Sequence, residues 1–252
     1  MSTKPLDGRV ALITGGSRGL GRAMAYALAE GGARIALVAR DAEQLKISAE
    51  GVRERGSQAE TYLADVTDED QVAKLQADVL AHFGHVDILI NNAGINIRKQ
   101  VQEFTLEEWN RVMATNVTSV FLLCRAFVPQ MKGRGYGRII NMTSIMSHVS
   151  IPGRTAYSSS KAALLGFTKS LALELALDGI TVVGISPGPF GTEMNTPLMN
   201  DPVLNAQFLS KIPAGRWGKV EEIGQLALFL CSDSAGFITG TDILIDGGWV
   251  AQ

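Results

Sequence analysis

The chain has 252 residues and a formal net charge of -2 at pH 7. This length is enough for one large α/β domain, and the near-neutral charge provides no basic excess for binding a nucleic-acid backbone. The N-terminus is polar, and no stretch approaches the ~20 uninterrupted apolar residues of a membrane span. We therefore expect a cytoplasmic protein that contacts neither nucleic acid nor membrane.

Short apolar runs alternate with longer amphipathic stretches along the chain. Five runs read as buried strands of a parallel sheet, at 10–13, 35–38, 88–90, 139–142 and 182–185. Six stretches read as helices, at 20–30, 42–55, 69–83, 106–131, 155–177 and 221–230. This alternation predicts an α/β fold with a doubly wound, Rossmann-type parallel sheet.

The organisation into domains follows from what the chain lacks. No linker, repeat or low-complexity tract divides it, so we expect residues 1–252 to form a single domain. The proline-rich stretch at 187–218 is the least regular, and it predicts a mobile lid or binding loop.

Cysteine and histidine usage bears on metal sites and compartment. Cys124 and Cys231 each lie in an apolar helical run, which predicts reduced core thiols in a cytosolic protein. The three histidines, His82, His85 and His148, have no ligand spacing with cysteines or carboxylates. We therefore expect no metal site.

A glycine-rich run follows the first predicted strand and opens the first predicted helix. Its glycines, Gly15, Gly19 and Gly21, are spaced G-x-x-x-G-x-G rather than G-x-G-x-x-G. Glycines at this place permit a tight turn and bring a pyrophosphate close to backbone amides. The run predicts a nucleotide-binding loop, and a purely structural turn is the alternative.

Tyr157 and Lys161 lie four residues apart near the start of a predicted helix. This spacing places a phenol and an ammonium on the same helical face. A fixed positive charge stabilises the phenolate and lowers its pKa from about 10 toward a value useful for proton transfer. The spacing alone also fits a solvated surface pair.

Further residues complete a pattern with this pair. The sequence Asn-Asn-Ala-Gly occupies 91–94, Asn116 lies in the next predicted helix, and Ser144 precedes Tyr157 by thirteen residues. With the glycine-rich run, these motifs resemble the classical short-chain dehydrogenase/reductase family in order and spacing, over essentially the whole chain. The resemblance implies an enzyme that interconverts a ketone and a secondary alcohol by hydride transfer with a nicotinamide cofactor.

The resemblance also implies catalytic roles. Tyr157 is the expected general acid/base, which gives a proton to the carbonyl oxygen. Lys161 would hold the nicotinamide ribose and lower the pKa of Tyr157, and Ser144 would donate a hydrogen bond to the substrate oxygen. Asn116 would anchor a water that links Lys161 to solvent. From its position alone, Asn116 could instead bond its own helix backbone.

The cofactor is expected to contact several segments. The expected contacts are Gly15, Ser17, Arg18, Gly19, Leu20, Gly21, Arg40, Asp65, Val66, Asn92, Ala93, Gly94, Tyr157, Lys161, Pro187, Gly188 and Thr192. By resemblance, Asp65 at the end of the third strand accepts from the adenine amine, although it could cap the next helix. Thr192 would contact the nicotinamide carboxamide. The last strand and tail, at 242–248, resemble a subunit-contacting segment and imply a homotetramer.

Charge at the end of the second strand bears on which cofactor is used. Ala39 stands where NAD-dependent members tend to have Asp, and Arg40 follows it. Arg18 in the glycine-rich run and Arg40 would converge on a 2′-phosphate, which favours NADP over NAD. Asp41, about twenty residues past the loop, is a possible ribose ligand, but we expect it to cap the next helix.

The substrate is less constrained. Segments 96–99 and 212–218, with Arg154, look similar to sugar-acid members such as gluconate 5-dehydrogenases and deoxygluconate dehydrogenases. Arg98 or Arg154 could anchor a substrate carboxylate, or both could be solvated loop residues or interface ion pairs. A mixed pocket of Met146, His148, Phe190, Met194 and Met199 keeps a 3-oxoacyl-carrier-protein reductase or a broad carbonyl reductase open.

A protein that senses the cofactor without catalysis is a different class of hypothesis. Such a protein would be expected to lack Ser144, Tyr157 or Lys161. All of them are present, so we expect an enzyme acting on a small-molecule carbonyl or alcohol.

Overall fold

The computed structural model describes residues 4–252, which contain a seven-stranded sheet in the order β3-β2-β1-β4-β5-β6-β7. Every neighbouring pair of strands is parallel. The strands are β1 (Val10–Thr14), β2 (Arg34–Ala39), β3 (Ala59–Leu63), β4 (Ile88–Asn91), β5 (Gly137–Met142), β6 (Ile180–Pro187) and β7 (Asp242–Ile245). The prediction of a doubly wound parallel sheet is confirmed.

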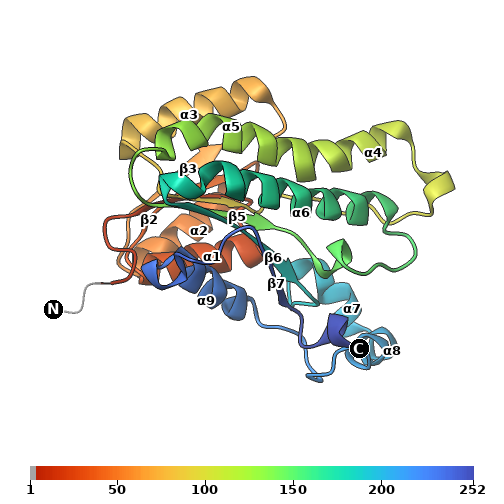
Figure 1. Ribbon diagram of the computed structural model, residues 1–252. Coiled ribbons are helices and arrows are strands. Elements are labelled where there is room, and N and C mark those ends of the chain that lie inside the picture. The colour runs from red at the N-terminus through yellow and green to blue at the C-terminus, as the bar shows by residue number, and fades with distance from the viewer. Residues whose placement is uncertain (1–3) are drawn as a thin grey trace.

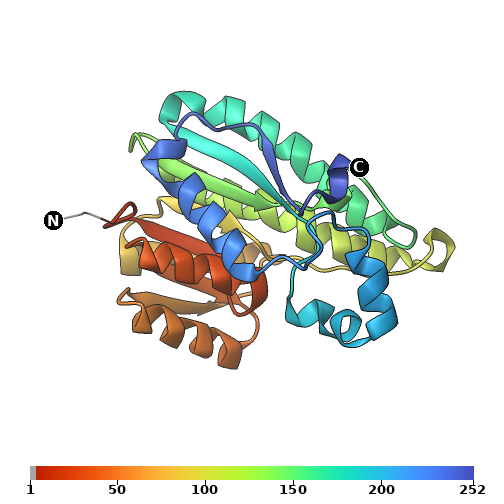
Figure 2. The same ribbon diagram turned by 90° about the horizontal axis from the view of Figure 1, so that it is seen from below.

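Helices cover both faces of this sheet (Figures 1 and 2). The α-helices are α1 (Gly19–Glu30), α2 (Ala42–Glu54), α3 (Glu69–Phe83), α4 (Leu106–Met113), α5 (Ser119–Met131), α6 (Thr155–Leu175), α7 (Thr196–Asn200), α8 (Pro202–Leu209) and α9 (Val220–Cys231). The short 3₁₀ turns are η1 (Val101–Glu103), η3 (Ile145–Ser147), η4 (Ala176–Asp178), η5 (Glu193–Asn195), η6 (Asp233–Ala235) and η7 (Trp249–Ala251). Helices α3, α5 and α6 lie on one face, and α1, α2 and α9 on the other.

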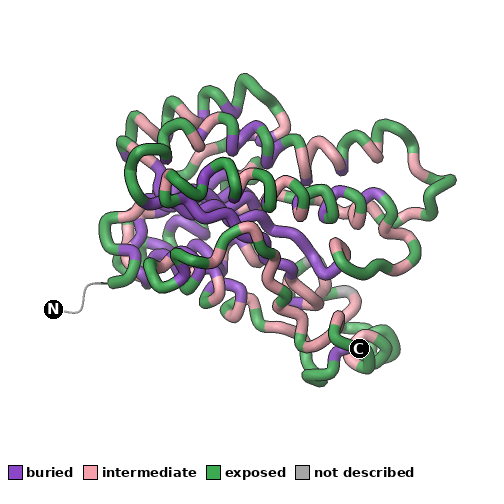
Figure 3. The backbone as a smooth tube through the Cα atoms, viewed as in Figure 1, coloured by how far each residue is buried: buried purple, intermediate pink, exposed green. Residues whose placement is uncertain are grey.

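The strands are buried on both faces because side chains alternate between two cores. In β1, Ala11 and Ile13 belong to the core under α1, α2 and α9. Val10 and Leu12 belong to the core under α3, α5 and α6. Figure 3 shows the central strands as the most buried part of the molecule. Cys124 and Cys231 are free and lie in these cores, and burial raises the pKa of each thiol to about 12.

The stretch expected as one helix over 106–131 contains a π-helical turn, η2 (Ala114–Thr118), between α4 and α5. By length and composition this stretch could cross a membrane, and 44% of its most apolar window is buried inside the fold. In Figure 1, α5 lies beside α3 and α6 against the sheet. The buried apolar side chains of α5 belong to the core under α3, α5 and α6.

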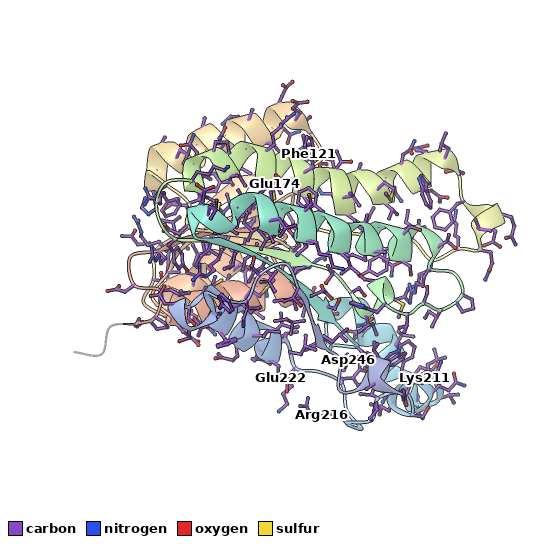
Figure 4. All side chains as sticks on the ribbon, in the orientation of Figure 1. Phe121, Glu174, Lys211, Arg216, Glu222 and Asp246 are labelled. Atoms are coloured by element: carbon purple, nitrogen blue, oxygen red, sulfur yellow. The ribbon has the colours of Figure 1, made fainter. Side chains whose placement is uncertain are left out.

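One strand end differs from expectation, and one alternative for a helix cap is wrong. The third strand ends at Leu63, so Asp65 and Val66 follow it. Asp68, not Asp65, caps α3, because its carboxylate accepts from the Gln71 amide at 3.0 Å. The last strand ends at Ile245, and Asp246 accepts from Gly248 and Val250 amides to form the turn after it (Figure 4).

The 187–218 segment is more regular than expected, since it contains η5, α7 and α8. Its two ends are joined, because the amide of Gly191 donates to Gly218 O and that of Gly218 to Pro189 O, each at 2.9 Å. The Phe208 ring stacks on Trp217 at 5.6 Å. The segment is thus a small lobe with a narrow base beside the sheet (Figure 2). Its mobility stays a prediction.

Candidate functional site

A cleft of about 700 Å³ lies at the carboxyl ends of the strands. Most residues expected at the cofactor and catalytic sites line it. These are Gly15, Ser17, Arg18, Gly19, Leu20, Arg40, Asp65, Val66, Asn92, Ala93, Gly94, Ser144, Tyr157, Lys161, Pro187, Gly188 and Thr192. Gly21 and Asn116 do not line the cleft, but they pack against Gly15 and Gly94, which do.

The glycine-rich loop forms the floor of the cleft. Gly15 and Gly19 have positive φ values of 63° and 55°, a conformation that L side chains rarely adopt. At Gly21, a Cβ would lie 2.3 Å from the Gly15 carbonyl oxygen, so only glycine lets α1 pack this close. These features leave room for a phosphate group next to the loop, as the glycine spacing predicts.

A polar network that the sequence did not reveal holds this loop. The buried Ser48 hydroxyl donates to Ser17 O at 2.9 Å, and Arg22 Nε donates to the same oxygen at 3.1 Å. Arg22 Nε also lies 2.9 Å from the Ser48 hydroxyl. One loop carbonyl is therefore fixed from both α1 and α2. Neither residue belongs to the glycine motif, so spacing offers no signal for them.

The turn at 91–94 is tied to the end of β1. The Thr14 hydroxyl accepts from the amides of Asn92 and Ala93, each at 3.1 Å. The Asn92 side chain donates to Thr14 O at 2.9 Å and Gly15 O at 3.1 Å. Asn92 therefore ties the 91–94 turn to the start of the glycine-rich loop.

Asn116 is buried in the π turn and bonds a different segment from its own helix. Its Oδ1 accepts from the Ile95 amide at 2.8 Å, and its Nδ2 donates to Ile95 O and Ser160 Oγ, each at 2.9 Å. The alternative that Asn116 bonds its own backbone is wrong. A Cβ on Gly94 would lie 3.3 Å from Asn116 Oδ1 and 3.6 Å from Lys161 Nζ. The side chains of Asn116 and Lys161 therefore both lie close to Gly94, which lines the cleft.

Lys161 is buried, with 5% of its surface exposed, and its ammonium donates to the Met142 carbonyl. Burial lowers the pKa of Lys161 from 10.5 to about 8, because the charged form loses water. Its Nζ lies 5.8 Å from the centroid of the Tyr157 ring. The interpretation of the two residues as a solvated surface pair is therefore wrong.

The low pKa of Lys161 predicts a pH-dependent stability. Below about pH 8 the folded protein buries a charge, which costs about 3 kcal/mol for a pKa lowered from 10.5 to about 8. Between these values the unfolded chain binds the extra proton, so stability rises with pH. Relative to Lys161→Met, the wild type should gain about 3 kcal/mol between about pH 7 and pH 10.5 in chemical denaturation. Lys169→Met, which removes an exposed lysine from the same helix, should show no such change.

Tyr157 differs from expectation in the direction of its pKa shift. Burial raises the pKa of Tyr157, and a hydrogen bond from Ser144 and the charge of Arg154 offset this only in part. The expected lowering by Lys161 is not found, because at this distance desolvation dominates. The Ser144 oxygen accepts from the Met146 amide at 3.1 Å, which leaves its own hydrogen free to donate.

The end of the cleft near β2 carries both arginines expected there. Arg18 is exposed, and Arg40 lies 3.4 Å from an Asp65 carboxylate oxygen. Burial favours protonation of Asp65, but hydrogen bonds from Thr67 and the Arg40 charge outweigh it and lower the pKa of that carboxyl. Asp41 caps α2 by accepting from the Gln44 amide at 3.1 Å, as predicted.

The two arginines considered for substrate binding differ in environment. Arg98 is exposed, whereas Arg154 is half-buried and lies near enough to Tyr157 and Arg98 for their charges to interact. Burial and the Arg98 charge lower the pKa of Arg154. Its Nη1 is buried and finds no acceptor within residues 4–252. Arg154 is therefore not a solvated loop residue, although it stands outside the cleft lining.

The expected mixed pocket is only partly formed. Phe190 is buried and lines the cleft, while Met146, His148 and Met199 do not line it. The Met194 side chain lies outside the described part of the structure. Asn96, from the 96–99 segment considered for the substrate, lines the cleft, and the polar cleft residues that sequence reasoning missed are Thr115, Thr143, Glu193 and Asn195. They adjoin the motifs in sequence, and that adjacency is the signal that could have found them.

Comparisons with known proteins agree with this geometry. A family model described as enoyl-(acyl carrier protein) reductase matches residues 15–250. The chain is 40% identical over 243 residues to a gluconate 5-dehydrogenase of Gluconobacter oxydans, covering 96% of this chain and 95% of that protein. It is 38% identical over 243 residues to a 3-oxoacyl-[acyl-carrier-protein] reductase of Haemophilus influenzae, covering 96% and 98%.

A solved structure is similar as well. It is a gluconate 5-dehydrogenase from Burkholderia cenocepacia in complex with NADP and tartrate. The TM-score is 0.93 and the identity 36%, over 99% of this chain and 98% of that one.

Proposed function

The chain belongs to the short-chain dehydrogenase/reductase family and is an oxidoreductase that acts on CH-OH or carbonyl groups, and we propose that it uses NADP to interconvert a keto-sugar acid and its secondary alcohol. The observation that carries this proposal is that Ser144, Tyr157 and Lys161 line the same cleft as the glycine-rich loop and Thr192. When bound, the nicotinamide cofactor supplies or accepts the hydride.

The residues of the chain supply the proton and position the substrate. Tyr157 gives a proton from its phenol oxygen to the carbonyl oxygen during reduction. Ser144 donates a hydrogen bond to that oxygen as negative charge develops. Lys161 holds the nicotinamide ribose, and Asn116 supports the wall against which Lys161 is placed.

NADP is favoured over NAD by charge. Arg18 and Arg40 line one end of the cleft, and two guanidinium groups suit a phosphate of charge about -2. Asp41, which would suit a ribose hydroxyl, is engaged as a helix cap. The similar Burkholderia structure contains NADP.

A keto-sugar acid is favoured by Arg154. Its half-buried guanidinium lies near enough to Tyr157 for their charges to interact, so the carboxylate of a substrate held at Tyr157 could pair with the exposed part of this group. The relatives named as gluconate 5-dehydrogenases are consistent with an acidic substrate.

Replacing Arg154 by Gln tests this substrate class. We expect KM for a keto-sugar acid to rise about 10- to 100-fold, because a charged hydrogen bond contributes about 1.5–3 kcal/mol. Reduction of an uncharged ketone should be nearly unchanged, and so should both reactions in the surface variant Arg125→Gln. An equal loss for both substrates would show that Arg154 supports the fold rather than the substrate.

A 3-oxoacyl thioester is the second candidate substrate, supported by the 38% identity to a 3-oxoacyl reductase and by the buried Phe190 in the cleft. A single panel of ketones, 3-oxoacyl thioesters and keto-sugar acids, assayed with NADPH and NADH, separates the two. A clear preference for thioesters, unaffected by Arg154→Gln, would replace the sugar-acid assignment.

A homotetramer is also part of the proposal. Exposed apolar side chains come from α5, α6 and η4, namely Phe121, Leu173 and Leu177, and from α9, the segment after η6 and β7, namely Phe229, Phe237 and Leu244. Phe121 marks the outer face of α5 in Figure 4. If each set pairs with its own symmetry copy, the two contacts together build a closed tetramer. Light scattering should report four times 26.9 kDa, and Leu173→Glu should reduce the assembly to dimers.

A further inference from the structure

The carboxylate of Asp242, at the start of β7, accepts hydrogen bonds from three different segments. Thr143 Oγ1 lies 2.5 Å from Oδ1, Ser186 Oγ lies 2.6 Å from Oδ2, and His148 Nε2 lies 2.7 Å from Oδ2. Thr143 and Ser186 are buried, and only 9% of the Asp242 side chain is exposed. We call these four residues the Asp242 clamp.

The donors in the clamp can be assigned. A carboxylate only accepts hydrogen bonds, so His148 Nε2 must carry a hydrogen. The Thr143 hydroxyl has one hydrogen and three nearby oxygens, Ile185 O, Ser186 Oγ and Asp242 Oδ1. A hydrogen bond to a charged acceptor is stronger than one to a neutral oxygen, so the hydroxyl hydrogen serves the carboxylate.

The fold makes room for this carboxylate. Gly184 of β6 is paired with Asp242 in register, and a Cβ on Gly184 would lie 2.0 Å from Asp242 Oδ1. Any other residue at 184 would therefore push the carboxylate away. The Asp242 carboxylate therefore occupies space left by the absent side chain of Gly184 and receives three hydrogen bonds. These hydrogen bonds offset the free-energy cost of burying a charge.

Asp242 bonds to residues on both sides of Ser144 in the sequence. Thr143 immediately precedes Ser144, and His148 follows it by four residues. The intervening η3 turn is internally bonded, because the amide of Ser147 donates to Ser144 O at 2.8 Å and that of His148 to Ile145 O at 2.9 Å. One carboxylate thus fixes both ends of the turn on which Ser144 lies.

We propose that Asp242 and His148 are positioning residues that hold the Ser144 hydroxyl in its hydrogen-bonding direction. This inference rests on the proposed role of Ser144. Within the described residues, Thr143 and Ser144 line the cleft while His148 and Asp242 do not, so the clamp acts through the turn rather than on the substrate. Without the His148 contact, the far end of the turn loses its side-chain connection to β7, and the hydroxyl direction is less restricted.

A double-mutant cycle between His148 and Ser144 tests this proposal. His148→Ala should lower kcat about 10- to 100-fold, the range for misplacing a reacting group by about 1 Å, without changing the Kd of NADPH. His148→Gln, whose amide can donate to Asp242, should recover most of the rate. In a Ser144→Ala background, His148→Ala should have no further effect. His82→Ala, on the exposed face of α3, is the matched control.

The outcomes separate the clamp from the proposed function. If Ser144→Ala leaves kcat unchanged, the proposed role of Ser144 fails and the clamp proposal with it. If Ser144→Ala lowers kcat but His148→Ala does not, or if the two losses multiply, only the clamp proposal is overturned. Asp242→Ala should reproduce the loss of His148→Ala. If it does not fold, the His148 variants carry the test alone.

Discussion

Replacing Tyr157 by Phe should lower kcat for ketone reduction about 10²- to 10⁴-fold, the contribution of a general acid to proton transfer. The ring keeps its packing, so NADPH affinity and the unfolding midpoint should stay near the wild-type values. Only the phenol hydroxyl, and with it the transferable proton, is lost. Tyr62→Phe, on β3, removes a hydroxyl far from Ser144 and should leave kcat unchanged.

The direction of the reaction should show a difference in pH dependence. Burial raises the pKa of Tyr157, so the protonated phenol that reduction requires is the form present at neutral pH. Oxidation requires the phenolate, and its rate should therefore rise with pH while reduction stays level. Steady-state rates in both directions over a pH series measure this. If Tyr157→Phe retained more than a tenth of the wild-type kcat, another group would be the proton donor.

Replacing Arg18 or Arg40 by Ala should lower kcat/KM for NADPH about 10- to 100-fold, because each charged hydrogen bond to a phosphate contributes about 1.5–3 kcal/mol. The value for NADH should change little, since NADH has no 2′-phosphate. Arg40 already shares its charge with Asp65, so the loss at Arg40 should be the smaller of the two.

The control for the cofactor variants is Arg125→Ala, which removes the same charge from the outer face of α5. It should leave both cofactors unaffected. Equal losses with NADPH and NADH would mean that the arginines stabilise the glycine-rich loop and do not contact the 2′-phosphate. Wild-type protein that used NADH as well as NADPH would contradict the charge argument directly.

The parts of the site predicted well from sequence are those held by local geometry. The glycine spacing places Gly15 and Gly19 at positive φ, and the four-residue spacing of Tyr157 and Lys161 places both in one cleft. Asp41 could be assigned as a helix cap because capping depends on neighbouring residues alone. The resemblance to a known family then added Asn116 and Ser144, which spacing alone could not distinguish from ordinary helix and loop residues.

The predictions that failed depend on distant neighbours. The π turn inside 106–131 arises where Asn116 bonds Ile95 from another segment, and helical periodicity carries no signal for it. The upward shift in the pKa of Tyr157 reflects burial by the folded chain, which a pair of residues in a sequence does not reveal. The contact between Arg40 and Asp65, which follow β2 and β3 and are 25 residues apart, was likewise not predicted.

The amino-acid order was sufficient for the alternation of strands and helices, the glycine-rich loop and the placement of Tyr157 and Lys161 in one cleft, because propensity, spacing and side-chain type are local properties. The folded chain was needed to reveal the burial of Lys161, the half-buried place of Arg154 beside Tyr157 and the Asp242 clamp. These depend on desolvation and on contacts between residues up to 99 positions apart. Such properties exist only once the strands are assembled side by side.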